Sequence, residues 1–263
     1  MNRSLYIWMT CLLSMSLSAI GQTVHSSYTT ANAHSHNDYE QAHPFWSAWQ
    51  NGFGSIEADI FLYDNKLIVA HDRQEMMAGR TLDSLYLNPL QQCILKNKGF
   101  VYPDTNRHLQ LMLDIKSEAM VTLKGLIEKL NDYPALVSCS SLHIVISGNR
   151  PDPSLFTGFP AWIWFDGELK KEYTVKELKM IAMFSDDFAR YSKWRGEGEL
   201  SEEERQELQS MVNKVHREGK KIRFWNAPDT HHSWHTLIDL GVNYINTDHI
   251  FELSDFLKNY PGN

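Results

Sequence analysis

Short apolar runs alternate with longer segments of helical spacing along most of the chain. The apolar runs, which are rich in β-branched and aromatic residues, are the candidate strands. They comprise the run up to His36 and the ranges 54–60, 109–115, 142–147, 161–165, 180–184, 221–226 and 244–248. Helical spacing predicts helices near 44–51, 81–97, 117–131, 168–178, 201–218, 232–240 and 252–259. This alternation is typical of parallel βα units.

The segment 201–218 has the clearest helix boundaries. Ser201 and Glu204 form a capping-box pattern at its start, and Gly219 stands where a helix ends in a left-handed conformation. Eight strands alternating with helices in roughly 240 residues predict a (β/α)8 TIM barrel, a fold that takes about 250 residues. A doubly wound open sheet is the alternative, but no glycine-rich phosphate loop follows the first strand. Since no linker or internal repeat is visible, we expect one domain over residues 22–263.

The start of the chain resembles a secretory signal peptide covering residues 1–21. Arg3 precedes an apolar stretch, and Ala-Ile-Gly at 19–21 fits a small-x-small cleavage site before Gln22. The alternative is a retained anchor helix, for which the apolar run is short. We therefore expect an exported protein, periplasmic or secreted, whose mature chain has no stable membrane span.

Composition narrows the classes of partner. Of the 263 residues, 43% are hydrophobic and 22% are charged, which suffices for one large core. The 25 basic and 32 acidic residues give a net charge of −7, and no basic cluster is dense enough to follow a phosphate backbone, so we expect no nucleic-acid partner. The spacing of Cys93 and Cys139 does not decide between a disulfide and two core thiols.

Polar residues gather at the carboxyl ends of the candidate strands, where barrel enzymes carry their active sites. These ends carry His36-Asn37-Asp38, Glu57 and Asp59, Asp114 with Lys116, Asn149, Asp166, Asp186-Asp187, Trp225-Asn226 and Thr247-Asp248. So many polar residues at one end of otherwise apolar strands predict that they share one site.

Two acids two residues apart suggest a metal site. Glu57 and Asp59 project from the same face of a strand, because side chains alternate along a strand. Asp114, at the end of another strand, adds a third carboxylate. Three hard oxygen ligands with further positions open to water describe a site for Mg²⁺ or Ca²⁺. The alternative for Asp114 and Lys116 is a structural ion pair at a strand end.

Two histidines are the candidate acid and base, because imidazole exchanges protons near neutral pH. His36 and His71 each follow an apolar run and have polar neighbours. Their place at strand ends puts them in register with the acids. Asp72 either orients a histidine or caps the following turn.

Several motifs together resemble the superfamily of TIM-barrel phosphodiesterases that includes glycerophosphodiester phosphodiesterases and phosphatidylinositol-specific phospholipases C. These motifs are HND, GFGSIEADIFL, KLIVAHD and LMLDIK, followed by RFWNAPD and LIDLGVNYINTD, which are similar to the closing segments of the family. The sequence His-Asn-Asp-Tyr is similar to the mitochondrial-inheritance-type branch. The resemblance covers nearly the whole chain after residue 21.

The resemblance implies a metal-dependent phosphoric diester hydrolase. Its substrates would be glycerophosphodiesters or diesters of phospholipid-derived headgroups. The implied roles are cation ligands at Glu57, Asp59 and Asp114, acid and base at His36 and His71, a phosphate contact at Lys116, and a contact near the leaving group at Trp225. A packing role for the tryptophan is equally compatible with its position.

Two positions depart from the family pattern. Asn37 stands where the main branch has arginine, so a bidentate phosphate contact is missing and Asn37 becomes the candidate substrate contact in its place. Asp114 stands where many members have the longer glutamate. These departures leave the reaction type in place and leave the substrate open.

Two other functions fit part of the pattern. His-Ser-His at 34–36 is compatible with a zinc site of the kind found in amidohydrolases and PHP-like hydrolases, completed by His143 and Asp248. That site leaves the paired acids without a task. The second alternative is a catalytically weak barrel that binds a headgroup, which Asn37 favours.

Overall fold

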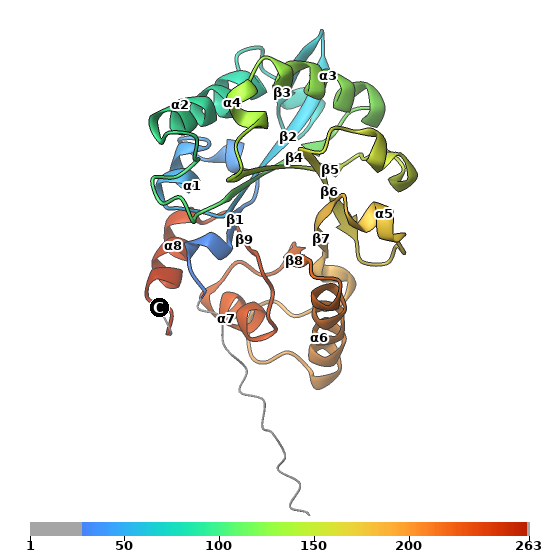
Figure 1. The fold of residues 1–263 in the computed structure, drawn as a ribbon. Helices are drawn as coiled ribbons and strands as arrows, with labels where there is room; N and C mark the ends of the chain where they lie inside the picture. Colours follow the sequence, from blue (N-terminus) through green and yellow to red (C-terminus); the bar gives the residue numbers. More distant parts are fainter. Residues whose placement is uncertain (1–27, 262–263) are drawn as a thin grey trace, which may run out of the picture.

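The computed structural model describes residues 28–261, so the predicted signal peptide lies outside the described residues. Its strands are β1 (Ala33–Ser35), β2 (Ser55–Tyr63), β3 (Lys66–Val69), β4 (Leu109–Ile115), β5 (Leu142–Gly148), β6 (Ile163–Glu168), β7 (Ile181–Asp187), β8 (Lys221–Trp225) and β9 (Ile245–Thr247). All but β3 lie in the order β8-β7-β6-β5-β4-β2-β1-β9, each parallel to its neighbours. A single bridge between Arg223 and Tyr244 joins the two ends of this order. The predicted TIM barrel is therefore confirmed, with a nearly closed sheet (Figure 1).

The helices lie around the outside of the strands (Figure 1). They are α1 (Trp46–Gln50), α2 (Asn88–Lys96), α3 (Ala119–Asn131), α4 (Pro134–Val137), α5 (Val175–Leu178), α6 (Glu202–Arg217), α7 (His231–Asp239) and α8 (Ile250–Lys258). The predicted boundaries of α6 are confirmed: Ser201 and Glu204 form the capping box, and Gly219 has φ +67°. None of the helices in the described part of the chain has the length and apolar character needed to cross a bilayer.

One strand, β3, was not predicted. It pairs antiparallel with β2, and positive φ angles of 46° at Asp64 and 55° at Asn65 form the tight turn between the two strands. The hairpin matters for the site, because it brings the chain directly to His71.

The helix predicted over 168–178 is wrong for most of its length. β6 continues through Glu168, where residues 166–168 pair with 183–185 of β7, and only α5 is helical. Strand pairing takes only Glu168 of the predicted range, and residues 169–174 form a turn and a loop. The helix begins only after Thr174, which caps it in a capping box with Glu177. The segment 81–97 is also divided, since a π-helical turn over Asp83–Leu87 precedes α2.

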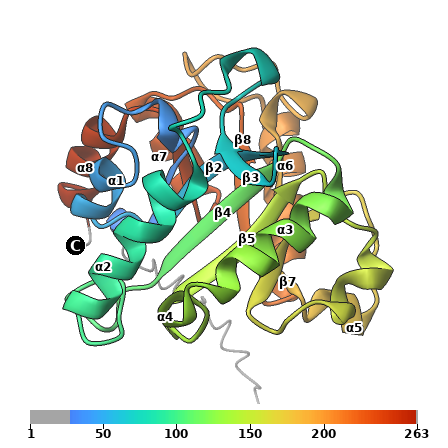
Figure 2. The same ribbon diagram turned by 90° about the horizontal axis from the view of Figure 1, so that it is seen from above.

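Alternation along β4 separates two layers of side chains. Its odd-numbered residues pack in the core between strands and helices. Met112 instead packs inside the barrel, in a cluster with Val145, Met183 and Tyr244. Asp114 follows Met112 by two residues, so its carboxylate points into the barrel above this apolar floor. Figure 2 shows β4 and β5 side by side, with α3 passing over them.

The two cysteines are buried and unbonded. Cys93 belongs to α2, and Cys139 follows α4. No disulfide therefore forms among residues 28–261, and both thiols fill space in the core.

Candidate active site

A cavity of about 370 Å³ opens at the carboxyl ends of the barrel strands. Every predicted site residue lines this cavity: His36, Asn37, Glu57, Asp59, His71, Asp114, Lys116 and Trp225. The structure thus brings together side chains that are as far as 189 positions apart (225 − 36) in the sequence. Their chemical roles stay predictions.

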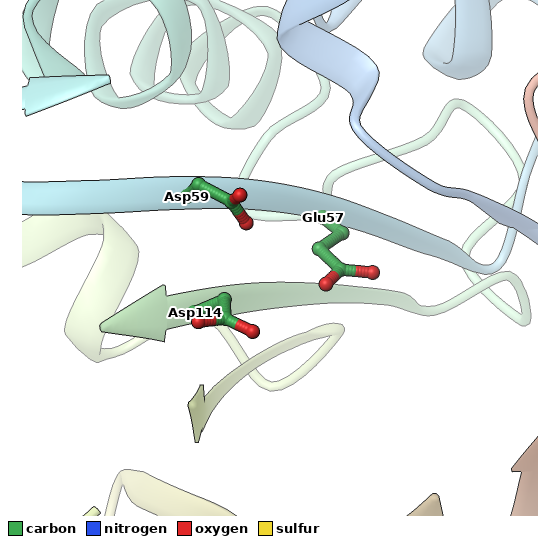
Figure 3. A group of neighbouring side chains, drawn as sticks. All are labelled: Glu57, Asp59 and Asp114. Carbon is green, nitrogen blue, oxygen red and sulfur yellow. The ribbon is translucent and has the colours of Figure 1, made fainter. Parts of the chain in front are cut away.

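The three acids form one cluster at the edge of two neighbouring strands. In the register of β2 and β4, Asp59 stands opposite Asp114, and Glu57 leaves β2 two residues earlier on the same face. One oxygen of each carboxylate lies within 4.8 Å of the others. Figure 3 shows Glu57 and Asp59 turned toward the side from which Asp114 approaches.

Glu57 is the deepest of the acids. Its Oε2 lies 2.5 Å from Nη1 of Arg223 and 2.7 Å from Nε2 of His34. Burial opposes ionisation, but the Arg223 guanidinium and the His34 ring outweigh it and hold the pKa of Glu57 well below its usual range. Glu57 is therefore a charged carboxylate at neutral pH.

Lys116 bridges the other two acids. Its Nζ lies 3.1 Å from Asp59 Oδ2 and 3.3 Å from Asp114 Oδ1, so the ion pair considered as an alternative for Asp114 and Lys116 is present. Burial, with the nearby Glu57 carboxylate, raises the pKa of Asp114 to about 6. Burial also raises the pKa of Asp59. Burial acts in the opposite sense on Lys116, but the two carboxylates outweigh it and raise the pKa of its ammonium.

Both candidate histidines are oriented by carboxylates through Nδ1. His36 Nδ1 lies 2.9 Å from Asp248 Oδ1, and His71 Nδ1 lies 3.2 Å from Asp59 Oδ2. Burial alone would lower the pKa of His36, but the hydrogen bond to Asp248 raises it above its usual value. Nε2 of each ring is then the nitrogen left to exchange a proton with a substrate.

The loop after β1 is fixed by a buried acid. Asp38 accepts hydrogen bonds from the Ser35 hydroxyl (2.8 Å), the Phe45 backbone N–H (2.5 Å) and the Tyr86 hydroxyl (2.9 Å). These contacts hold the preceding residue, Asn37, at φ +43°, a left-handed conformation that asparagine tolerates better than most residues. Asp38 therefore positions the loop and takes no part in the cavity lining.

Tyr39 connects this loop to the acids. Its hydroxyl lies 2.9 Å from Asp59 Oδ2 and 3.1 Å from the side-chain oxygen of Asn37. The guanidinium of Arg80 holds the Tyr39 carbonyl from the other side. One consequence is that Asn37, beyond lining the cavity, helps to fix a side chain that contacts Asp59.

Arg223 and Arg150 line the cavity, although neither was predicted as a site residue. Arg223 lies on β8 two residues before Trp225, so strand alternation alone places it on the same face as a predicted site residue. A charged residue within an apolar strand was the available signal. Arg150 lies in the loop after β5, where no periodicity indicates which way a side chain points.

The residues of the proposed zinc site do not converge. His143 lies at the amino end of β5 and lines a different cavity with Lys221 and Tyr244, whereas Asp248 follows the carboxyl end of β9. The ring of His34 is buried against Ser55 and Glu57. Over residues 28–261, the three acids are the one group of three or more potential metal ligands.

The acids fit a single divalent cation. Oxygens that are each about 2.0–2.6 Å from one Mg²⁺ or Ca²⁺ ion lie at most about 4–5 Å apart, which matches the spacing of 4.8 Å or less. In addition, Oδ1 of Asp59 is buried and accepts no hydrogen bond from a described residue. A buried carboxylate oxygen without a donor loses hydration, and a bound cation compensates for that loss.

Two family comparisons agree with this geometry. The AIM6-like phosphodiesterase domain matches residues 22–135, and the glycerophosphoryl diester phosphodiesterase family matches residues 221–250. These matches confirm the resemblance of the chain to phosphodiesterases of the glycerophosphodiester phosphodiesterase type. The first match contains the loop after β1, both acids of β2 and His71, and the second contains β8 and β9. The two matched segments are thus similar to phosphodiesterase domains.

Individual similar proteins match most of the chain. Altered inheritance of mitochondria protein 6 of Eremothecium gossypii is 26% identical over 290 residues, covering 91% of this chain and 72% of the relative. Its homolog in Arthroderma benhamiae is 23% identical over 253 residues, covering 82% and 81%. The crystal structure of a glycerophosphodiester phosphodiesterase from Parabacteroides distasonis superposes with a TM-score of 0.55 at 15% identity, covering 86% of this chain and 96% of that one. The last similarity concerns the fold.

Proposed function

We propose that the protein is a metal-dependent phosphoric diester hydrolase. The observation that carries the proposal is the cluster of three acids within 4.8 Å of one another, in a cavity that His36 and His71 also line. An exported location, as the first residues of the chain suggest, belongs to the same proposal.

Glu57, Asp59 and Asp114 would hold the cation, Mg²⁺ or Ca²⁺. When bound, the cation supplies positive charge next to the phosphate oxygens, which carry the charge that develops during diester cleavage. Lys116 contributes an ammonium at the same place, since its Nζ already lies between Asp59 and Asp114. Because its pKa is raised, Lys116 stays protonated at neutral pH.

The two histidines move the protons. Nε2 of one ring takes the proton of the attacking hydroxyl, which belongs to water or to a neighbouring group of the substrate. Nε2 of the other ring gives a proton to the oxygen of the leaving alcohol. Asp248 and Asp59 contact Nδ1 of the two rings, so Nε2 of each ring is the nitrogen available for proton transfer with the substrate.

The lining of the cavity favours a hydrophilic substrate. Apart from Gly148 and Trp225, every residue that lines it is polar or charged. An acyl chain would find almost no apolar surface there, whereas a phosphate on a small polar alcohol would find hydrogen-bond partners. We therefore propose glycerophosphodiesters or phospholipid-derived headgroup diesters as substrates, with Trp225 beside the leaving alcohol.

Diester hydrolysis tests the proposal directly. The full chain is incubated with bis(p-nitrophenyl) phosphate and with glycerophosphodiesters, with Mg²⁺, with Ca²⁺ and with a chelator. We expect metal-dependent release of the alcohol, and a loss of about 10²–10⁴ in turnover for His36→Ala and for His71→Ala, because each acts in proton transfer. His143→Ala, at the other end of the barrel, serves as the control and should keep full activity.

Other outcomes would identify the competing functions. Tightly bound zinc with activity that depends on His143 would point to an amidohydrolase-type enzyme. Binding of glycerophospho-headgroups without metal-dependent hydrolysis of any diester would point to a binding barrel. Full activity of His36→Ala would contradict the assignment of the acid–base pair.

A further inference from the structure

The cavity has more arginines than the proposed reaction uses. Position 37 carries asparagine where the main branch of the family has arginine, so the guanidinium contact to the phosphate is absent from the loop after β1. Three arginines from other elements line the cavity, namely Arg150, Arg190 and Arg223. Any of them could supply a guanidinium, and their surroundings distinguish them.

Two of the three arginines, Arg223 and Arg190, already pair with other carboxylates. The Arg223 side chain is only 3% exposed and lies beneath Glu57, with Nη1 on that carboxylate. The Arg190 side chain is 55% exposed and pairs at 2.9 Å with Asp186 of its own segment, four residues earlier. The first is too deep to reach a phosphate above the acids. The second has a largely exposed side chain, and the buried Asp186 carboxylate already balances its charge.

Arg150 is both oriented and accessible. Its side chain is 15% exposed, its Nη1 donates to the Asp166 carbonyl at 2.6 Å, and its Nη2 donates to Glu168 Oε1 at 3.2 Å. Nη1 also lies 3.5 Å from Asp166 Oδ2. A guanidinium has five N–H groups, so these contacts leave Nε–H and one Nη2–H for another acceptor.

Asp166 is the buried anchor of this arginine. It is 2% exposed, and its Oδ2 accepts hydrogen bonds from the hydroxyls of Ser147 on β5, at 3.0 Å, and Ser185 on β7. The proposed reaction gives no task to Asp166, although it lines the same cavity as the acids. A carboxylate fixed by two neighbouring strands makes the position of the Arg150 fork rigid, which lowers the entropic cost of binding an anion.

The loop geometry brings Arg150 to the acid cluster. Gly148, two residues before it, lies so close to Asp114 that an added Cβ would be 2.0 Å from Asp114 Oδ1. Arg150 therefore follows by two residues the glycine that packs against a predicted cation ligand, and it lines the same cavity. Lys116 contacts Asp114 from the end of β4, and both Lys116 and Arg150 line the cavity that contains this carboxylate.

We propose that Arg150 binds a non-bridging phosphate oxygen of the substrate and takes over the contact that Asn37 does not make, with Asp166 as its positioning residue. The inference rests on the proposed function, because it assumes that a phosphate lies over the three acids. Arg150 supplies a planar fork at that place, and lysine does not reproduce its geometry.

Binding of inorganic phosphate tests this role separately from catalysis. Phosphate affinity is measured by calorimetry on the full chain, with and without Mg²⁺, for the wild type, Arg150→Gln, Arg150→Lys and the control Arg190→Gln. We expect Arg150→Gln to bind phosphate about ten- to a hundredfold more weakly, as loss of a charge-assisted hydrogen bond predicts. Arg150→Lys should recover only part of the affinity, and Arg190→Gln should stay within about twofold of the wild type.

A double-mutant cycle tests the anchor. Asp166→Asn should weaken phosphate binding in the wild-type background and have no further effect in the Arg150→Gln background, because it acts through Arg150. A merely structural role for Asp166 would weaken binding equally in both. Unfolding curves of each variant establish that it is folded.

The results separate this inference from the proposed function. Phosphate affinity of Arg150→Gln and Arg150→Lys within twofold of the wild type, or no phosphate binding by the wild type, would overturn the role of Arg150. If phosphate binding depends on Arg150 but no diester is hydrolysed, the phosphate contact stands and the proposed catalysis fails. If diesters are hydrolysed but phosphate affinity does not depend on Arg150, the proposed catalysis stands and the phosphate contact fails.

Discussion

The imidazole of His36 has one carboxylate hydrogen-bond partner, Asp248, which also raises its pKa. Asp248 Oδ1 lies 2.9 Å from Nδ1 and raises the pKa of the ring, against the effect of burial. Asp248 follows the last strand of the barrel, 212 residues away in the chain. Burial and Arg223 lower the pKa of His36, and Asp248 and Glu57 raise it, so removing the Asp248 carboxylate should change a pH profile in which His36 takes part.

Asp248→Asn should move one limb of the pH–rate profile to lower pH. Without the carboxylate, the pKa of His36 falls, so the ring loses its proton at lower pH. A general base acts when neutral, so the acid limb of kcat/KM moves if His36 is the base. The alkaline limb moves if His36 is the general acid, which acts when protonated.

The measurement is kcat/KM for bis(p-nitrophenyl) phosphate across the pH range. Asp239→Asn is the matched control, because Asp239 pairs with His235 on the exposed side of α7, and its profile should coincide with that of the wild type. A profile of Asp248→Asn that shifts in neither limb contradicts a catalytic role for His36.

The sequence predicts which site residues lie together where the alternation of side chains along a strand applies. Glu57, Asp59 and Asp114 share one face because of the period of two, and the register of β2 with β4 then brings them together. Arg223 follows the same rule and could have been found. Arg150 could not, because its direction depends on contacts with Asp166 and Glu168 that exist only in the folded chain.

Between strands, β5 shapes the acid cluster by ending in a glycine. Gly148 has φ +66°, and an added Cβ would lie 2.0 Å from Asp114 Oδ1 and 2.7 Å from the Ile115 carbonyl oxygen. Both distances are shorter than a real Cβ contact allows. The end of β5 therefore limits where the Asp114 carboxylate can lie.

Gly148→Ala should weaken binding of the divalent cation by about tenfold or more, because it displaces the Asp114 carboxylate. A loss of about 1.4 kcal/mol of binding free energy already corresponds to a factor of ten. The variant should also lose stability, partly from the positive φ and partly from the displaced carboxylate. Calorimetric titration with Mg²⁺ and with Ca²⁺ measures the change in cation affinity. Urea unfolding measures the change in stability.

Gly219→Ala separates the two causes. Gly219 has φ +67°, but an added Cβ there meets no atom within 4 Å. This control should lose only about 1 kcal/mol of stability and keep its cation affinity. Equal cation affinity in Gly148→Ala and Gly219→Ala would show that Gly148 does not determine the position of Asp114.

The order of elements was largely predictable, and the errors have local causes. The barrel strands β1, β2 and β4–β9 each fall on a predicted apolar run, because strands buried on both faces read as continuous hydrophobic segments. β3 was missed because its pairing with β2 is antiparallel and needs a two-residue turn. The helix over 168–178 is short because a turn and a loop follow β6 and the helix begins only after the cap residue Thr174.

At the scale of the whole molecule, the barrel closes at its weakest point beside the acid cluster. β8 meets the chain just before β9 at an isolated bridge between Arg223 and Tyr244, whereas each other neighbouring pair of barrel strands has a ladder of two to seven residue pairs. The side chain of Arg223 crosses from β8 to Glu57 on β2. This buried ion pair therefore ties the two sides of the seam together and also balances the charge of a predicted cation ligand.

Arg223→Met should destabilise the metal-free protein by about 3–5 kcal/mol, because it leaves Glu57 buried without its main counter-charge. The same loss of positive charge makes the acid cluster more negative, so a divalent cation should bind more tightly than in the wild type. Added Mg²⁺ or Ca²⁺ should then raise the free energy of unfolding of Arg223→Met by more than it raises that of the wild type, in proportion to the logarithm of the affinity.

Urea unfolding with chelator and with each cation measures both effects. The double variant Arg223→Met, Glu57→Gln removes both charges of the pair, and should recover much of the lost stability while losing the response to the cation. Arg190→Gln, which removes an exposed cation from Asp186 in the same cavity, should change stability by less than about 1 kcal/mol, because Asp186 keeps its hydrogen bond from Tyr191. If Arg223→Met unfolds at the wild-type urea concentration in chelator, the ion pair does not hold the seam. If both proteins gain equally from the cation, Arg223 does not oppose its binding.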